Sequence, residues 1–375
     1  MKIIDNKRIV IKIGSTSIID EETGEIKHAW LSSLASDIAQ LVELGKEIVI
    51  ISSGAIAIGK KFLQLSSKNS NSKKLLLEQK QAAAACGQAS LIRAYEEIFQ
   101  QFDINIAQIL LTIDDTENRR HYLNARSTIN NLIENKIIPV INENDTVATP
   151  EIKFGDNDRL SATVARMIQA NLLIILSDID GLYDKNPNIY SNASHIPLVE
   201  EINNDIMQMA TGSDSSIGTG GMKTKLIAAK IALTGGCHAV ISQANQQNPI
   251  LSIDENRLKA TWFMATDTPT SSYKNWLSSI LQSNGQLIID DGAVAALKDG
   301  KSLLPVGILR IDGEFNRGDA VDILDINNNK LARGLINFSY DEAQKIIGKQ
   351  TNLIEDILGY QGRSEIIHRN EMVIL

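Results

Sequence analysis

A run of eight residues, Gly218-Thr-Gly-Gly-Met-Lys-Thr-Lys225, leads directly into the helical pattern of residues 226–233. Glycine allows a ligand to approach the backbone closely, and a helix start presents unpaired N–H groups and the positive end of the helix dipole. The positive charges of Lys223 and Lys225 are unfavourable beside the positive end of the dipole unless an anion binds there. The run is neither a P-loop nor G-x-G-x-x-G, because Met222 precedes Lys223 and Lys223 replaces the last glycine. It predicts a phosphate site, with a capping turn carrying solvated lysines as the alternative interpretation.

Lys12 is a second cation that could meet an anion. It interrupts the otherwise apolar stretch Ile9–Ile13, which predicts a buried strand, and the small residues Gly14-Ser-Thr-Ser17 follow. Burying a lysine is costly unless an anion pairs with it. A lysine that reaches solvent at the sheet edge is the alternative, but the Gly/Ser/Thr loop favours a ligand.

Two polar clusters lie at predicted element ends. Asn142-Glu-Asn-Asp145 follows the predicted strand 137–141, and Gly155-Asp-Asn-Asp158 opens the predicted helix 159–169. Either cluster alone could be turn or cap chemistry. Two clusters so placed indicate a binding site, and Ser177-Asp178 ends a further predicted strand, 172–176.

The elements that would position these residues alternate between strand and helix. Strand 8–13, helix 30–42 and strand 47–51 form a βαβ unit, which requires a parallel sheet. Ligands bind beyond the carboxyl ends of such strands, where Gly14 and Ser53 both lie. Other predicted elements are a helix over 75–100, a strand over 106–112, a helix over 123–135, and a strand over 239–242, expected to be the last of the sheet.

The pattern changes after Gly285. Short strands are expected over 286–289, 304–309, 320–324 and 331–337, with a helix over 339–347, separated by Asp-Gly pairs. This predicts a small β-rich second domain. We therefore expect a first domain over residues 1–258, a linker over 259–284 and a second domain over 285–375.

Composition excludes several classes of protein. The 375 residues suggest about two domains, and 43% hydrophobic with 22% charged residues is ordinary for a soluble protein. The net charge of −8 argues against general attraction to nucleic acid or anionic membranes. No apolar run approaches the ~18 residues of a membrane span, and the N-terminus does not have the pattern of a signal peptide. We expect a cytoplasmic protein with Cys86 and Cys237 as reduced core thiols.

Six stretches in this order resemble the glutamate 5-kinase family of the amino acid kinase superfamily. The superfamily's first phosphate loop is similar to Lys12–Ser17, and its nucleotide-base strand and loop to Leu176–Pro187. The stretches more specific to the family are Ser52–Gly59, Asn142–Ala148, Gly155–Asp158 and Gly218–Lys225. The tail from Gly285 resembles a PUA domain. Ser177 stands where threonine is also common, and Lys223 where serine is also common.

The resemblance implies a three-layer αβα sandwich with a mostly parallel sheet, followed by the PUA-like domain. It also implies ATP-dependent phosphorylation of the side-chain carboxylate of L-glutamate to L-glutamyl 5-phosphate, the first step of proline biosynthesis. Members of the family are commonly inhibited by proline and commonly form dimers or tetramers.

Roles for individual residues follow from the chemistry and from the resemblance. The carboxylate nucleophile has a pKa of about 4.3 and needs no general base at neutral pH. Lys12 and Lys225 would clamp the transferring phosphoryl group, assisted by N–H groups of Gly14, Gly54, Gly220 and Gly221. By resemblance Asp158 holds both lysines, and Ser53, Asp145 and Asn157 recognise glutamate. ATP, brought with Mg²⁺ whose protein ligands are unknown, would contact Lys12, Gly14, Ser177, Asp178, Thr219, Gly220, Gly221, Met222, Lys223, Thr224 and Lys225.

Three alternatives remain open. An aspartokinase, acetylglutamate kinase or uridylate kinase would share the superfamily motifs, but residues 142–148 and the PUA-like tail argue against them. An RNA-binding protein is disfavoured, because residues 280–375 hold 10 Lys+Arg and 14 Asp+Glu, a net charge of −4. A degenerate kinase that only senses a ligand is disfavoured by the presence of both Lys12 and Lys225.

Overall fold

The protein folds into two compact units, Met1–Pro269 and Thr270–Leu375. The structure, a computed structural model, describes residues 2–20, 22–63, 75–147, 156–210, 221–279 and 283–375. Across these ranges, none of the helices is both long and apolar enough to cross a bilayer.

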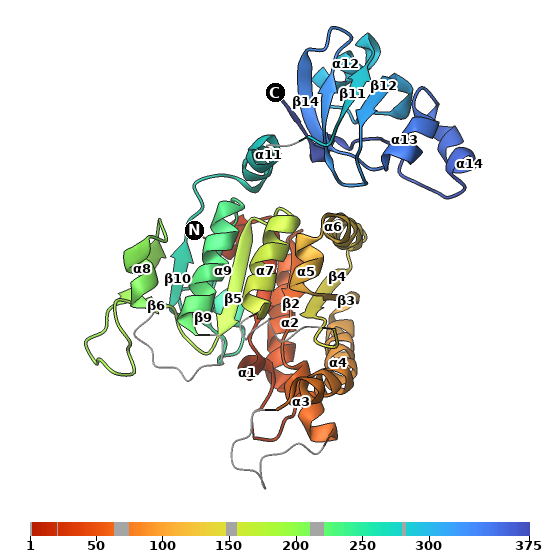
Figure 1. The fold of residues 1–375 in the computed structure, drawn as a ribbon. Coiled ribbons are helices and arrows are strands. Elements are labelled where there is room, and N and C mark those ends of the chain that lie inside the picture. The colour runs from red at the N-terminus through yellow and green to blue at the C-terminus, as the bar shows by residue number, and fades with distance from the viewer. Residues whose placement is uncertain (1, 21, 64–74, 148–155, 211–220, 280–282) are drawn as a thin grey trace. The chain divides into compact units, whose positions relative to one another are not determined.

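The first unit is built on an eight-stranded sheet with the order β3-β4-β2-β1-β5-β9-β10-β8 (Figure 1). Neighbouring strands are parallel throughout, except that β10 pairs with β9 in the antiparallel sense. Its strands are β1 (Arg8–Ile13), β2 (Glu47–Ile51), β3 (Ile106–Leu111), β4 (Ile138–Glu143), β5 (Leu172–Ser177), β8 (Leu198–Val199), β9 (His238–Gln243) and β10 (Ala260–Phe263), and a separate hairpin joins β6 (Leu182–Tyr183) to β7 (His195–Ile196).

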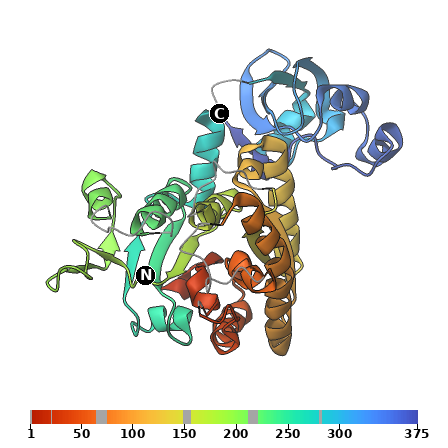
Figure 2. The same cartoon turned by 60° about the horizontal axis from the view of Figure 1, so that its bottom comes forward.

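The helices of this unit cover both faces of the sheet, as Figure 1 and the turned view in Figure 2 show. They are α1 (Ser15–Ile18), α2 (His28–Glu43), α3 (Ala55–Phe62), α4 (Leu77–Phe99), α5 (Ile113–Glu117), α6 (Arg119–Glu134), α7 (Asp156–Met167), α8 (Asn204–Met209), α9 (Met222–Thr234) and α10 (Pro249–Asp254). The expected αβα sandwich with a mostly parallel sheet is confirmed.

Strand β1 shows why Lys12 is placed where it is. Alternate residues of a strand face opposite sides of the sheet. Ile9, Ile11 and Ile13 pack into the core formed with α2 and α4, whereas Val10 packs into the core formed with α7 and α9. Lys12 shares the face of Val10, so its side chain lies on the side covered by α7 and α9.

The candidate residues gather at one edge of the sheet. Because β1, β2, β4 and β5 are parallel, their carboxyl ends meet there, and Lys12 lies opposite Ile51 of β2 and Ile175 of β5. Helices α7 and α9 precede β5 and β9 in the chain, so their N-termini also lie at this edge. Residues distant in sequence are thereby brought together, as expected for a parallel sheet.

Helices α3 and α4 pack with their backbones almost in contact. A Cβ atom added at Gly87 of α4 would lie 1.9 Å from the carbonyl oxygen of Ala55, and one at Gly59 of α3 would lie 1.7 Å from that of Ala83. Gly54 is the N-cap of helix α3, and its φ of 112° strongly favours glycine. Helix α4 therefore fixes the position of the loop that carries Ser53.

Two sequence predictions fail in this unit. Strand β9 is not the last of the sheet, because β10 and β8 extend it. Within residues 259–284, for which a linker is expected, the structure has β10 and the helix α11 (Pro269–Ser279), and the division between the two units falls after Pro269. Cys86 is exposed on α4 rather than buried in the core, whereas Cys237 is buried as expected.

The second unit is β-rich, as predicted. Its five-stranded sheet has the order β12-β11-β13-β14-β15, with only β11 and β13 pairing in parallel. The predicted strand 304–309 is wrong, since Pro305–Gly307 forms a 3-10 turn and the strand begins at Ile308. The elements are β11 (Gly285–Ile289), α12 (Asp291–Lys298), β12 (Ile308–Gly313), β13 (Ala320–Leu324), β14 (Lys330–Leu335), α13 (Tyr340–Ile346), α14 (Ile354–Leu358) and β15 (Met372–Ile374).

Candidate active site

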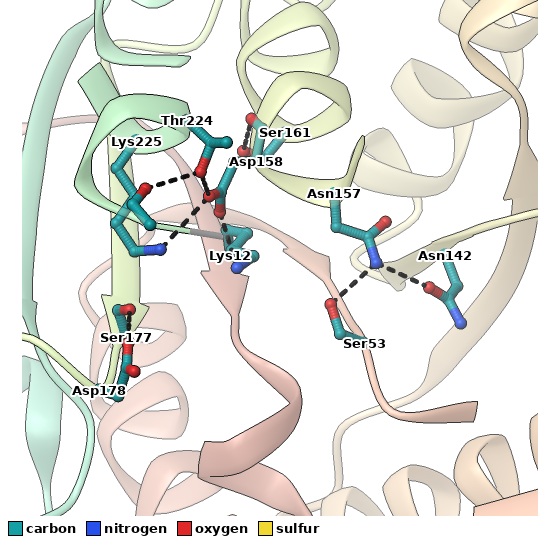
Figure 3. A network of polar contacts seen from close by, with 11 residues as sticks. Lys12, Ser53, Asn142, Asn157, Asp158, Ser161, Ser177, Asp178, Thr224 and Lys225 are labelled. Carbon is teal, nitrogen blue, oxygen red and sulfur yellow. Dashed lines mark hydrogen bonds and ion pairs between the residues drawn. The ribbon is translucent and has the colours of Figure 1, made fainter. Parts of the chain in front are cut away.

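A buried carboxylate lies between two ammonium groups at the carboxyl edge of the first sheet (Figure 3). The Nζ atom of Lys12 is 2.7 Å from Oδ1 of Asp158, and that of Lys225 is 3.4 Å from Oδ2. The residues Lys12, Asp158 and Lys225 retain 7%, 2% and 2% of their accessible surface. These three charges come from β1, α7 and α9, which meet only in the folded sheet.

Thr224 completes this cluster. Its hydroxyl group lies 2.9 Å from Oδ2 of Asp158 and 2.8 Å from the carbonyl oxygen of Gly221, so it can donate to either atom. The contact joins the first turn of α9 to α7. It ties the backbone just before Lys225 to the carboxylate that holds the lysine.

The electrostatics of the cluster favour binding of an additional anion. Burial raises the pKa of Asp158, but Lys12 and Lys225 outweigh it and hold the pKa below the ordinary 3.8. Burial lowers the pKa of Lys225 from the ordinary 10.5, against the opposing effect of Asp158. Two buried cations and one buried anion therefore lie together here, with the carboxylate of Asp178 close enough to act on Lys225. An excess of buried positive charge favours the binding of an anion.

A second cluster of amides and hydroxyls lies beside this one. Nδ2 of Asn157 donates to Oγ of Ser53 at 2.8 Å and lies 3.4 Å from Oδ1 of Asn142. Nδ2 of Asn142 in turn donates to Oε1 of Gln88 at 2.6 Å. Oδ1 of Asn157 is buried and has no hydrogen-bond partner within the described part of the chain.

Ser177 and Asp178 end strand β5 close to Lys225. The Ser177 hydroxyl donates to Oδ1 of Asp178 at 2.7 Å, and the Asp178 carboxylate is close enough to oppose the lowering of the Lys225 pKa. The next turn contains Gly181, whose φ is 132° and where a Cβ atom would lie 2.6 Å from both Nε2 of His195 and Oγ1 of Thr261. The chain therefore leaves β5 along a tightly constrained path.

Other predicted residues lie at the same edge, around these two clusters. Asp145 lies half-buried in the turn after β4 and has interactions of its own. Met222 and Lys223 open α9, where Lys223 is exposed and Gly221 is the N-cap. Thr219 and Gly220 lie outside the described residues.

Gly14 follows β1 at the same end of the sheet. Its N–H group, for which a role in the phosphate clamp is expected, donates to the carbonyl oxygen of Leu176 in β5 at 3.1 Å. A Cβ atom at Gly14 would lie 3.5 Å from the carbonyl oxygen of Leu176 and 3.9 Å from Nζ of Lys12, both ordinary van der Waals contacts.

Gln88 is a site residue that the sequence does not reveal. It lies within the long helix α4, where a single glutamine in a helical pattern carries no signal of function. Asn142 belongs to a predicted cluster but has no predicted role. Only the fold shows that α4 reaches the carboxyl end of β4, which brings these two amides together.

The described residues offer no protein cage for a divalent cation. They contain no group of three or more His, Cys, Asp or Glu side chains that could hold a metal ion. The Asp158 carboxylate is already engaged by two ammonium groups, and that of Asp178 accepts from Ser177.

Comparisons with known proteins give the family. The model of the amino acid kinase family matches residues 7–242, and the PUA domain model matches residues 285–358. A glutamate 5-kinase of Bartonella henselae is 48% identical over 373 residues, which cover 100% of this chain and 97% of that protein. The glutamate 5-kinase of Rhodopseudomonas palustris is 48% identical, and the alignment covers 98% of this chain and 96% of that protein. The glutamate 5-kinase of Paramagnetospirillum magneticum is 45% identical, and the alignment covers 98% of each protein.

A solved structure, that of UMP kinase from Ureaplasma parvum, aligns with 69% of this chain and 98% of its own at 16% identity and a TM-score of 0.47, which is too distant to bear on the substrate. The family models and the curated relatives carry the assignment instead, because they span both units of the chain. The chain therefore belongs to the amino acid kinase family, among the glutamate 5-kinases, and carries a PUA domain after its kinase domain.

Proposed function

We propose that this enzyme transfers the γ-phosphoryl group of MgATP to the side-chain carboxylate of L-glutamate. The observation that carries the proposal is the buried Lys12–Asp158–Lys225 cluster next to the Ser53–Asn157 pair. The first cluster suits the charge of a transferring phosphoryl group, and the second suits the polar end of an amino acid. The names of the relatives agree with this substrate.

The chemical step is an in-line displacement at phosphorus. An oxygen of the glutamate carboxylate forms a bond to the γ-phosphorus, the bond from that phosphorus to the bridging oxygen breaks, and ADP leaves with the electron pair. The nucleophile is already ionised at neutral pH, since its pKa is about 4.3, so no proton must be removed. The protein therefore has two remaining tasks, which are to bring the two anions together and to stabilise the charge on the oxygens of the phosphoryl group.

Lys12 and Lys225 would provide that stabilisation, with Asp158 as a positioning residue. Preformed cations in a site without water need no rearrangement as charge develops on the transferring group, which is the largest source of catalysis in such reactions. The negative charge of Asp158 offsets the repulsion between the two ammonium groups and so holds them in place before the substrates bind. Thr224 would reinforce this position through its contact with Asp158.

Glutamate recognition would rest on Ser53, Asp145 and Asn157. The carboxylate of Asp145 and Oδ1 of Asn157 are suited to accept from the α-ammonium group, and the hydroxyl of Ser53 can donate to the α-carboxylate. The nucleotide would lie along Gly14, Ser177 and Asp178.

The loop before helix α9 would complete the nucleotide site with the remaining predicted residues, Thr219, Gly220, Gly221, Met222, Lys223, Thr224 and Lys225. Mg²⁺ would enter as part of MgATP, held by phosphate oxygens and water. The acyl phosphate product would serve proline biosynthesis in the cytoplasm. Inhibition by proline and assembly into dimers or tetramers complete the proposal, on the family resemblance alone.

Trapping of the product tests the function. The purified protein would be incubated with MgATP and hydroxylamine together with L-glutamate, L-aspartate, N-acetyl-L-glutamate or UMP, and both ADP and hydroxamate would be measured. We expect hydroxamate with L-glutamate and close to none with the other compounds. ADP release with UMP and without hydroxamate would instead indicate a nucleotide kinase, and turnover of aspartate or acetylglutamate would overturn the assignment of Ser53, Asp145 and Asn157.

The lowered pKa of Lys225 predicts the alkaline limit of the reaction. The ammonium form is the active one, so kcat/KM for MgATP falls as pH rises through the pKa in the free enzyme. Because burial lowers that pKa, the fall should begin below pH 10.5. In Lys225→Arg the guanidinium group keeps its charge, so the remaining activity should persist to higher pH. An unchanged alkaline limb in this variant would show that another group is responsible.

A further inference from the structure

We infer that Gln88 is a positioning residue for the amino-acid site, acting through Asn142 on Asn157. This inference rests on the proposed function, because it concerns how the enzyme selects a substrate with an α-ammonium group. Its basis is the hydrogen-bonded chain Gln88–Asn142–Asn157–Ser53, part of which is drawn in Figure 3.

The orientation of the whole chain follows from one backbone group. The N–H of Glu143 lies 3.0 Å from the side chain of Asn142, and a backbone N–H can only donate. The atom of Asn142 that faces it is therefore the oxygen, and the NH₂ group must point the other way, toward Gln88. Gln88 must then turn its oxygen toward Asn142, and Oε1 of Gln88 does lie 2.6 Å from Nδ2 of Asn142. Both ends of the buried Asn142 amide are thereby held.

The orientation of the Asn142 amide also determines that of Asn157. The Asn142 oxygen that accepts from Glu143 also faces Asn157 at 3.4 Å, so Asn157 turns its NH₂ group toward it and toward Ser53. The Asn157 oxygen is left buried and, among the described residues, without a donor. The Ser53 hydroxyl accepts from Asn157 and keeps its proton for another partner. The pocket therefore offers an acceptor from Asn157 and a donor from Ser53.

This polarity matches an amino acid and not a simple dicarboxylate. An ammonium group satisfies the buried acceptor, and a carboxylate satisfies the hydroxyl donor. A compound that lacks the ammonium group would leave the Asn157 oxygen unpaired, and a buried polar group without a partner costs about 1–3 kcal/mol. If Asn142 rotated, Asn157 could turn its NH₂ group into the pocket, and the preference for an ammonium group would weaken.

Gln88 is held firmly enough to act in this way. The adjacent Gly87 packs against the backbone of α3, and Tyr95, seven residues further along α4, has its hydroxyl 3.0 Å from Oγ of Ser52. Residues seven apart lie on the same face of a helix. Helix α4 thus contacts both the loop of Ser53 and the end of β4, so its glutamine keeps a constant position relative to both.

Two substitutions with opposite effects on the acceptor test the inference. Gln88→Met has nearly the same size and no oxygen, whereas Gln88→Glu keeps an acceptor for Asn142. Glu96→Met, on an exposed position of the same helix, is the matched control. The measured constants are KM for L-glutamate, KM for MgATP, and the ratio of kcat/KM for L-glutamate to that for glutarate, which lacks the ammonium group.

For Gln88→Met we expect KM for L-glutamate to rise about tenfold and the glutamate-to-glutarate ratio to fall about tenfold, with KM for MgATP within about twofold of the wild type. Gln88→Glu should stay within about threefold on both measures, and Glu96→Met should match the wild type. Equal losses in the two Gln88 variants, or an unchanged ratio in Gln88→Met, would overturn the inference while leaving the proposed function intact. No turnover of L-glutamate by the wild type would overturn both.

Discussion

Lys225→Ala is expected to lower kcat for glutamate phosphorylation about 10³-fold. The loss of one preformed charge aimed at the transferring phosphoryl group costs on the order of 10²–10³ in rate, and cationic clamps in phosphoryl transfer reach higher values. Because the ammonium group of Lys225 is almost completely buried, water cannot easily replace it. Lys12→Ala should behave in the same way, since it occupies the other side of Asp158.

The matched control for this prediction is Lys230→Ala. Lys230 lies on the same helix, α9, but is exposed and outside the site, so kcat should change by less than about twofold. Steady-state rates of hydroxamate formation, with circular dichroism to establish folding, provide the measurement. A Lys225→Ala protein that is folded and keeps more than about a tenth of the wild-type kcat would exclude a catalytic role for this lysine.

Asp158→Asn is expected to remove activity and to destabilise the fold at the same time. The buried carboxylate is an ion-pair partner of both Lys12 and Lys225. Removing one partner of a buried ion pair typically costs about 3–5 kcal/mol, because a buried charge is left uncompensated. The lysines should then lose their alignment, and kcat should fall at least about 10²-fold.

The pH dependence of this effect has a definite sign. The folded state holds the pKa of Asp158 below 3.8, so its contribution to stability is present above the unfolded value and is lost as pH falls through the lower, folded value. The difference in the free energy of unfolding between wild type and Asp158→Asn should therefore be constant near neutral pH and shrink below about pH 3.8. Urea denaturation over this range measures it, with the exposed Asp103→Asn as control. A variant as stable as the wild type at pH 7 would contradict the buried-pair interpretation.

Much of the kinase domain can be predicted from local patterns. Continuous apolar runs such as Arg8–Ile13 and Glu47–Ile51 appear as strands with the expected bounds, and the strand–helix alternation leads to the parallel sheet. The lysine within the first run is buried and paired with Asp158, in agreement with the expectation that a buried charge in an apolar strand needs an anion, whereas the predicted ligand stays a prediction. These features depend on residues that are close together in the sequence, so a local sequence pattern predicts them.

The predictions that failed depend on tertiary contacts. Strand β10 is only four residues long and pairs with β9 in the antiparallel sense, so it does not continue the repeated strand–helix pattern of the parallel strands. Cys86 lies on the exposed side of α4, which composition cannot distinguish from the buried side. The contact between Thr224 and Asp158, and the approach of Gln88 to Asn142, each join residues more than fifty positions apart. A local sequence pattern does not predict contacts between residues so far apart in the sequence.

The route of a single oxygen atom tests most directly whether the glutamate carboxylate is the phosphoryl acceptor. L-glutamate labelled with oxygen-18 in its side-chain carboxylate would be incubated with the protein, unlabelled MgATP and hydroxylamine, and the released phosphate examined by mass spectrometry. If the carboxylate attacks the γ-phosphorus, hydroxylamine cleaves the acyl bond and leaves one labelled oxygen in each phosphate formed with hydroxamate. Phosphate without label would show that water is the acceptor, and would contradict phosphoryl transfer to glutamate.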